Sequence, residues 1–130
     1  MGMEQPPWRT PTRRFERFDV TDCSVLIQKG GFLGMGKGKD IGGPILDMSD
    51  FGMRYAGMER LQIGANLTVL TRLVPIGRQM KIPVVVRWCS QDTRYPDRVI
   101  VGLEFIGMGE EHLGQIQKLR EVMRKATAGS

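Results

Sequence analysis

The sequence predicts a mainly β fold, a small antiparallel barrel that carries one C-terminal helix. Short stretches of alternating apolar residues recur between turn signals, and no helical segment separates them in the rhythm of βαβ units. Five or six strands are expected in this way. The last long segment, residues 110–126, instead has apolar residues at helical spacing. With 130 residues and no internal repeat, the chain suits a single domain.

The expected strands cover residues 18–28, 44–49, 52–58, 66–74, 80–90 and 98–106. Apolar residues expected to share a face within a strand are Cys23, Val25 and Ile27; Ile82, Val84, Val86 and Trp88; and Val99, Val101, Leu103 and Phe105. Pro83 predicts an edge or a bulge because proline has no N–H to donate. Gly102, in the middle of a strand, predicts close approach by a neighbour or a ligand.

The expected helix has an apolar face and a charge pattern that suits its dipole. Glu110 and Glu111 fall in its first turn, and Arg124 and Lys125 fall in its last turn. The residues expected on its apolar face are Leu113, Ile116, Leu119, Met123 and Ala126.

Two segments outside the strands are expected to be poorly ordered without a ligand. Residues 1–12 are rich in proline and predict a mobile N-terminal arm, so the domain is expected over 13–126 with a tail over 127–130. Residues 29–43 include seven glycines and predict a flexible hairpin loop. Within this loop, Gly31–Lys37 spells the start of a phosphate-binding loop. A glycine follows where Ser or Thr is needed, which excludes a nucleotide triphosphatase.

A tight turn with polar side chains is predicted at Asp47, Ser49 and Gly52, in a D-x-S-x-x-G arrangement. Gly52 can supply the positive φ that such a turn often needs. Asp47 and Ser49 project from one face of an extended segment, where a carboxylate and a hydroxyl suit the donor-rich edge of guanine. The alternative is a turn in which both side chains bond their own backbone.

An arginine cluster precedes the first strand. Arg13 and Arg17 form an R-x-x-x-R pair with Arg14 between them, although Arg9 and Arg13 also satisfy this spacing. Near the end of the chain, residues 101–105 read V-G-L-E-F. These three motifs, in this order, resemble the PilZ domain family from about Arg13 to residue 124. The long glycine-rich segment before Asp47 departs from the family pattern.

The resemblance implies a six-stranded barrel that binds the bacterial second messenger cyclic di-GMP. It places the arginines on the phosphates and guanine edges, and Asp47 and Ser49 on a guanine. The ligand-binding residues implied are Arg13, Arg14, Arg17, Asp47, Ser49 and Gly52. Gly102, Trp88 and Arg87 are further candidates, since their strands could line the site; core packing is the alternative for Trp88.

Composition narrows the remaining classes of function. The net charge of +5 and pI of about 9.6 favour anionic partners. Two cysteines and one histidine predict neither a disulfide framework nor a metal site. Catalysis is not expected, because Ser49 has only the distant His112 as a candidate base. The first residues do not form a signal peptide and no apolar run could span a membrane, so a cytoplasmic protein is expected.

The predicted function is a cyclic di-GMP receptor that controls motility, biofilm or exopolysaccharide output through a downstream protein partner. No cofactor besides this ligand is expected. One alternative is a basic barrel that binds RNA or single-stranded DNA, which would need several aromatic residues exposed on strands. Only nine aromatic residues are present, and three of these, Trp8, Phe15 and Phe18, flank the arginines. Another alternative is a PilZ-like module that binds a protein and no nucleotide.

Overall fold

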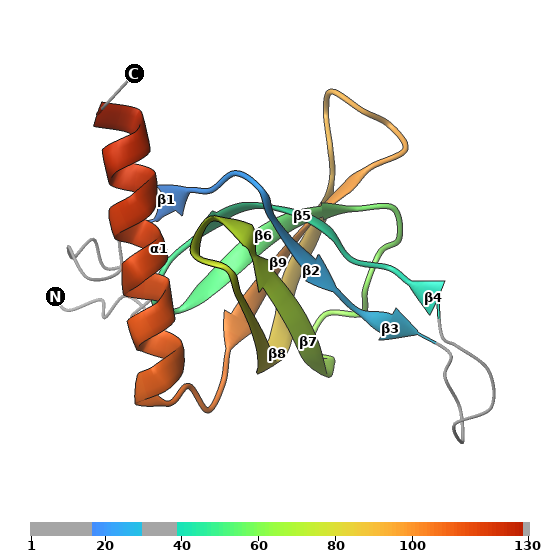
Figure 1. Ribbon diagram of the computed structural model, residues 1–130. Coiled ribbons are helices and arrows are strands. Elements are labelled where there is room, and N and C mark those ends of the chain that lie inside the picture. Colours follow the sequence, from blue (N-terminus) through green and yellow to red (C-terminus); the bar gives the residue numbers. More distant parts are fainter. Residues whose placement is uncertain (1–16, 30–38, 129–130) are drawn as a thin grey trace, which may run out of the picture.

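Six antiparallel strands close into a barrel, and one helix follows them (Figure 1). The computed structural model describes residues 17–29 and 39–128. The barrel strands are β2 (Cys23–Leu26), β5 (Gly43–Met48), β6 (Gly52–Gly57), β7 (Asn66–Leu73), β8 (Arg78–Gln91) and β9 (Val99–Phe105). They are hydrogen-bonded in the order β5-β2-β7-β8-β9-β6, and pairing of β6 with β5 closes the ring. The predicted fold class is therefore confirmed.

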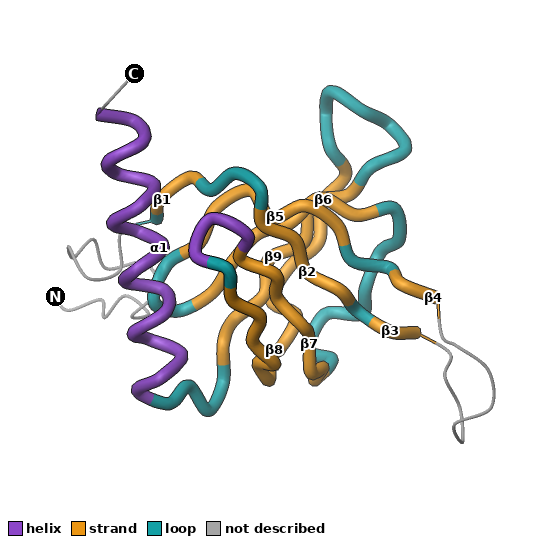
Figure 2. Tube along the Cα trace, viewed as in Figure 1, coloured by secondary structure: helices purple, strands orange, loops and turns teal. Residues whose placement is uncertain are grey.

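Shorter elements complete the described chain. Strand β1 (Phe18–Asp19) pairs with β5, while β3 (Gln28–Lys29) and β4 (Lys39–Asp40) form a separate two-stranded ribbon. A 3₁₀ turn, η4 (Val74–Ile76), links β7 to β8, and α1 spans Glu110–Ala128. Figure 2 shows the strands curved into a barrel, with α1 outside it and beside β1.

The predicted first strand, residues 18–28, is divided into three pieces. Asp22 has a φ of 58°, in the left-handed region that aspartate tolerates better than most residues. The chain turns there, and β1 and β2 pair one after the other, in shifted register, with the edge of β5 that does not pair with β6. The alternation itself is confirmed, because Cys23, Val25 and Ile27 are all buried.

The predicted face of β8 is wrong at one residue. Val86 pairs with Leu103 and Trp88 pairs with Gly102, so Arg87 is an extra residue in β8 at this point. Such a bulge reverses the side-chain alternation. Ile82, Val84 and Val86 are buried in the core, whereas Trp88 is half-buried outside it.

Pro83 lies where β8 stops pairing with β9. Its carbonyl accepts a hydrogen bond of 2.9 Å from the N–H of Ile106, just beyond the end of β9. In β7, Thr68 is its partner. The predicted edge or bulge at Pro83 is not found, because β8 is an internal strand and its bulge lies at Arg87; Pro83 is instead just past the end of the β8–β9 ladder at Val84.

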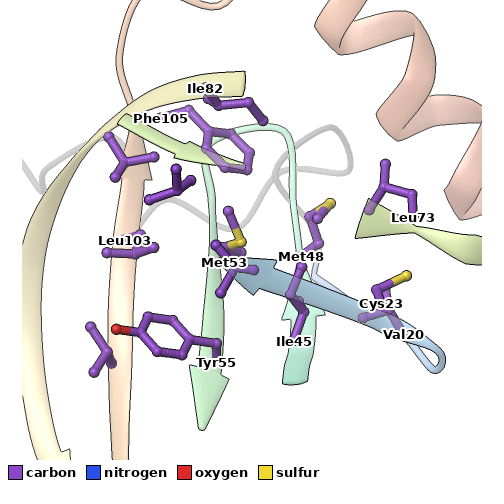
Figure 3. Packing of buried hydrophobic residues seen from close by; sticks show 14 of the residues in the cluster. Val20, Cys23, Ile45, Met48, Met53, Tyr55, Leu73, Ile82, Leu103 and Phe105 are labelled. Atoms are coloured by element: carbon purple, nitrogen blue, oxygen red, sulfur yellow. The ribbon is translucent and has the colours of Figure 1, made fainter. Parts of the chain in front are cut away.

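The core fills the barrel and extends under the helix. Figure 3 shows Met48, Met53, Tyr55 and Leu103 among the side chains inside the barrel. The helix contributes the buried residues Ile116, Leu119 and Met123. Leu113 is only half-buried and Ala126 is exposed, so the apolar face of α1 is narrower than predicted.

Part of the glycine-rich segment is ordered, contrary to the prediction for residues 29–43. Oδ1 of Asp40 accepts hydrogen bonds from the N–H groups of Ile27 at 3.0 Å and Gly42 at 2.9 Å. These bonds connect the ribbon to the barrel. Residues 1–12 and the phosphate-loop-like Gly31–Lys37 lie outside the described residues.

Candidate functional site

The turn between β5 and β6 is held by Ser49. Its N–H donates to the carbonyl of Gly52 at 2.8 Å, and its Oγ accepts a hydrogen bond of 3.1 Å from the N–H of Phe51. The Ser49 side chain is buried. Ser49 thus makes the local backbone bond that the sequence left open as an alternative, and this bond fixes the shape of the turn.

Gly52 is required here for a different reason than the one predicted. Its φ is not positive; among the described glycines only Gly64, Gly77 and Gly107 have positive φ. A Cβ on Gly52 would instead lie 2.1 Å from the carbonyl oxygen of Leu103. The glycine allows β6 to approach β9 closely at the end of the turn.

Asp47 is a buried carboxylate held by two arginines. Only 3% of the residue is exposed. Its Oδ1 accepts a hydrogen bond of 2.9 Å from Nη1 of Arg17, and its Oδ2 accepts bonds from Nε of Arg54 at 2.8 Å and from Nη2 of the same arginine. The hydrogen bonds that Arg54 donates to Asp47 raise the pKa of the Arg54 guanidinium. A carboxylate so enclosed is stable in the interior because both oxygens are satisfied.

Arg54 is a residue that the motif search missed. It is paired with Asp47 directly across the β5–β6 hairpin. Counting outward from a turn over 50–51 pairs residue 49 with 52, residue 48 with 53 and residue 47 with 54. The hairpin register, rather than a motif, could therefore have identified it.

A groove of about 540 Å³ lies beside this carboxylate. Its lining comes from the end of the turn and from the strands β6, β9 and β8, together with Arg17. The lining residues are Arg17, Phe51, Gly52, Arg87, Trp88, Gly102, Leu103 and Glu104.

The floor of the groove is formed where Gly102 meets Trp88. Gly102 lies between Arg54 of β6 and Trp88 of β8 in the strand register. A Cβ on Gly102 would lie 2.4 Å from Nε1 of Trp88, so the indole rests on the glycine backbone. The predicted close approach at Gly102 is confirmed, with Trp88 as the neighbour.

The charges at the groove are mixed but mostly positive. Arg17 and Arg87 both line it, and Glu104 pairs with Nε of Arg87. The Arg87–Glu104 pair is more than one-third exposed on the arginine side, so solvent screens it. A flat indole beside guanidinium groups can contact a planar ring and an anion together.

The structure brings most of the predicted site residues together. Arg17, Gly52, Arg87, Trp88 and Gly102 line the groove. Asp47 and Ser49 lie next to it in the turn, but both are buried and neither is among its lining residues. Arg13 and Arg14 lie outside the described residues.

The described part of the chain gives no support for a metal site or for a membrane-spanning helix. No cluster of three or more His, Cys, Asp or Glu side chains in residues 17–29 and 39–128 could hold a metal ion. Across the same ranges, none of the helices has the length and apolar character needed to cross a membrane.

Comparison with known proteins agrees with this architecture. The family described as "PilZ domain" matches residues 11–121. No curated protein matches the chain.

Several solved structures share the fold at low sequence identity. YcgR from Escherichia coli, in complex with c-di-GMP, is 16% identical with a TM-score of 0.67, and the match covers 91% of this chain and 50% of YcgR. K. pneumonia MrkH, also with c-di-GMP, is 19% identical with a TM-score of 0.71, over 93% of this chain and 57% of MrkH. Bacillus subtilis MotI/DgrA, an inhibitor of motility, is 21% identical with a TM-score of 0.69, over 96% and 58%. The chain thus spans about half the length of these proteins.

Proposed function

The chain belongs to the PilZ domain family, and we propose that it is a receptor that binds cyclic di-GMP in the groove beside Asp47. Domains of this family are typically non-catalytic receptors. The observation that carries the proposal is the meeting of Arg17 and the Asp47 turn at one groove. These residues come from separate motifs, 30 positions apart, and the fold joins them in a single ion pair.

The groove offers the contacts that a cyclic dinucleotide needs. Arginine can bond phosphate oxygens in pairs, and it can equally bond O6 and N7 of guanine. The exposed guanidinium of Arg17 is the described cation best placed for this role, and Arg87 is a second. Trp88 presents a flat indole on the floor, which suits stacking against a purine.

The proposed roles of the remaining site residues follow from their positions. Arg13 and Arg14 precede Arg17 by only a few residues, so they can reach the same ligand. Asp47 would accept hydrogen bonds from the donor edge of a guanine, and Ser49 would keep the turn in shape. Asp47 has both oxygens engaged, so binding requires Arg17 to leave its carboxylate and turn to the ligand.

The alternative of a nucleic-acid-binding barrel receives less support from the aromatic residues. Among the described aromatics, Tyr55 and Phe105 are in the core and Phe18 lies against Arg120. Of the aromatic residues that the structure describes, only Phe51 and Trp88 line the groove. Successive bases of a single strand need a longer row of stacking platforms. A protein-interaction module without a nucleotide is the other alternative.

We further propose that the receptor acts in the cytoplasm through a downstream protein partner, in control of motility, biofilm or exopolysaccharide output. Support comes from the families of protein that share the fold. The MotI/DgrA structure, for example, is of an inhibitor of motility.

Paired calorimetric titrations test the proposed ligand. Cyclic di-GMP and cyclic di-AMP carry the same phosphates, but adenine presents an amino donor where guanine presents O6 to arginine. We expect cyclic di-GMP to bind at least about a hundredfold tighter, which corresponds to roughly 2.7 kcal/mol. Both titrations are made at equal, near-physiological salt, so that phosphate attraction is common to the two ligands. Similar affinities would favour the nucleic-acid-binding barrel, and no binding of either would favour the protein-interaction module.

A further inference from the structure

The two oxygens of the Asp47 carboxylate have different partners. Oδ2 accepts both hydrogen bonds from Arg54, through Nε and Nη2. Oδ1 accepts a single hydrogen bond of 2.9 Å, from Nη1 of Arg17. One oxygen is thus committed to one arginine, and the other oxygen depends on a second arginine.

The two arginines differ in how firmly the fold holds them. Arg54 lies within β6, between β5 and β9, where its backbone is paired with Asp47 on one side and Gly102 on the other. Arg17 precedes the two-residue strand β1, and its side chain is exposed about as much as that of Arg54, 46% against 39%. The backbone at Arg17 can therefore shift with little change in the barrel, whereas the backbone at Arg54 is fixed between two strands.

A buried carboxylate needs a partner when Arg17 leaves. An ionised carboxylate that loses all its hydrogen bonds in a protein interior is strongly destabilised. Arg54 would keep its two bonds to Oδ2, so the carboxylate would stay in place with Oδ1 free. Two bonds from one planar guanidinium to Oδ2 also hold that oxygen in place more firmly than a lysine ammonium, whose donors rotate freely.

We propose that Arg54 is a positioning residue of the ligand site. It holds Asp47 through Oδ2 and thereby keeps Oδ1 directed toward the groove. When the ligand binds, the N–H donors of a guanine replace Arg17 at Oδ1. This inference rests on the proposed function, because the exchange requires a guanine ligand. It assigns to Arg54 an effect on the recognition of the base rather than on attraction of the phosphates.

The test compares cyclic di-GMP and cyclic di-AMP on single and double variants. Arg54→Ala should weaken cyclic di-GMP binding about tenfold, the size of one lost hydrogen bond to a charged group. Its effect on cyclic di-AMP should be less than about twofold, because adenine lacks the paired donors that Asp47 accepts. Arg54→Lys should restore the affinity only in part, since the ammonium keeps the charge but not the paired geometry.

A double-mutant cycle separates positioning from direct contact. If Arg54 acts through Asp47, then adding Arg54→Ala to Asp47→Asn should weaken cyclic di-GMP binding by less than about twofold further. Additive losses, or equal losses for the two dinucleotides, would show that Arg54 contacts the ligand or contributes only charge. Either result would overturn the inference.

Control measurements distinguish failure of this inference from failure of the proposed function. Arg72→Ala removes an exposed arginine from β7, away from the groove lining, and should leave both affinities unchanged. Thermal unfolding identifies any variant that loses the fold, and Arg54→Gln, which removes less of the side chain, then replaces Arg54→Ala. If the native protein binds cyclic di-GMP and the Arg54→Ala or Arg54→Gln variant binds it equally well, only the inference fails. If the native protein does not bind it, the proposed function fails and the inference fails with it.

Discussion

Arg120 of α1 donates a hydrogen bond of 2.8 Å to Oδ1 of Asp50, and this bond joins the C-terminal helix to the turn that follows Asp47. The Cζ atom of Arg120 also lies 5.0 Å from the centre of the Phe18 ring, in β1. Since Phe18 follows Arg17 directly, one side chain connects the helix with both segments that supply the candidate site.

Arg120→Ala should therefore destabilise the protein. It removes a part-buried ion pair and a cation–π contact, which together are worth about 1–2 kcal/mol. Urea unfolding measures the loss. The matched control is Arg124→Ala on the same helix, whose partner Glu121 is an exposed i, i+3 neighbour. That change should leave the unfolding midpoint unmoved, because water screens the pair. Equal effects of the two variants would mean that Arg120 does not anchor the helix.

The arginines before β1 are expected to matter more for binding than the lysines of the glycine-rich segment. Arg13→Ala and Arg17→Ala should each weaken cyclic di-GMP binding by about 1.5–3 kcal/mol, the range for hydrogen bonds to charged groups. Lys37→Ala and Lys39→Ala should have much smaller effects. Calorimetric titration of the four variants compares them directly. A larger loss from the lysines would place the anion site in the glycine-rich segment.

Much of the fold could be predicted from alternation alone. The buried apolar side chains of β9 are the four that its period of two indicated, because each strand has one face inside a closed barrel. The bulge at Arg87 could not be predicted this way. One extra residue reverses the alternation after it, and no local residue type marks the position. The alternation consequently placed Trp88 on one face with Ile82, Val84 and Val86, and left core packing open as the alternative to a place in the site.

The candidate site was predictable at its motifs but not in its internal contacts. The turn at Asp47 and Ser49 and the arginine at 17 were visible as sequence patterns. The ion pair of Asp47 with Arg54 follows from strand register, and the role of Gly52 follows from the approach of β9. Both depend on pairing between strands, which a linear motif does not contain.

Stability should fall at alkaline pH in a way that depends on Cys23. Burial raises the pKa of this thiol from its ordinary value of 9.0 to about 11, and the neighbouring Asp22 adds to the effect. The native state therefore retains a proton that the unfolded chain releases, so the contribution is complete below pH 9.0 and is lost as the pH rises toward about 11. Urea unfolding at pH 8 and pH 10.5 should show a smaller decrease for Cys23→Ala than for the native protein. Parallel decreases would exclude the thiol as the cause.

Three glycine-to-alanine changes should differ in their effects on the free energy of unfolding and on ligand binding. Gly114→Ala lies in α1 with nothing within 4 Å of the added Cβ, so it should stabilise the helix by about 0.5–1 kcal/mol. Gly52→Ala would place a Cβ 2.1 Å from a backbone oxygen of Leu103, which cannot move alone. Its cost should be at the upper end of the roughly 1–3 kcal/mol typical of overpacking. Urea unfolding measures both changes.

Gly102→Ala is the change expected to act on the groove. Its added Cβ meets the Trp88 indole, at 2.4 Å from Nε1, and a side chain can rotate away where a backbone carbonyl cannot. The loss of stability should therefore be smaller than for Gly52→Ala, while the displaced indole changes the floor on which a guanine would stack. We expect cyclic di-GMP affinity to fall and the tryptophan emission to shift, measured in a Trp8→Phe background so that Trp88 is the only fluorophore of its kind. Unchanged emission with unchanged affinity would show that Trp88 keeps its position without the glycine, and the floor would then not depend on Gly102.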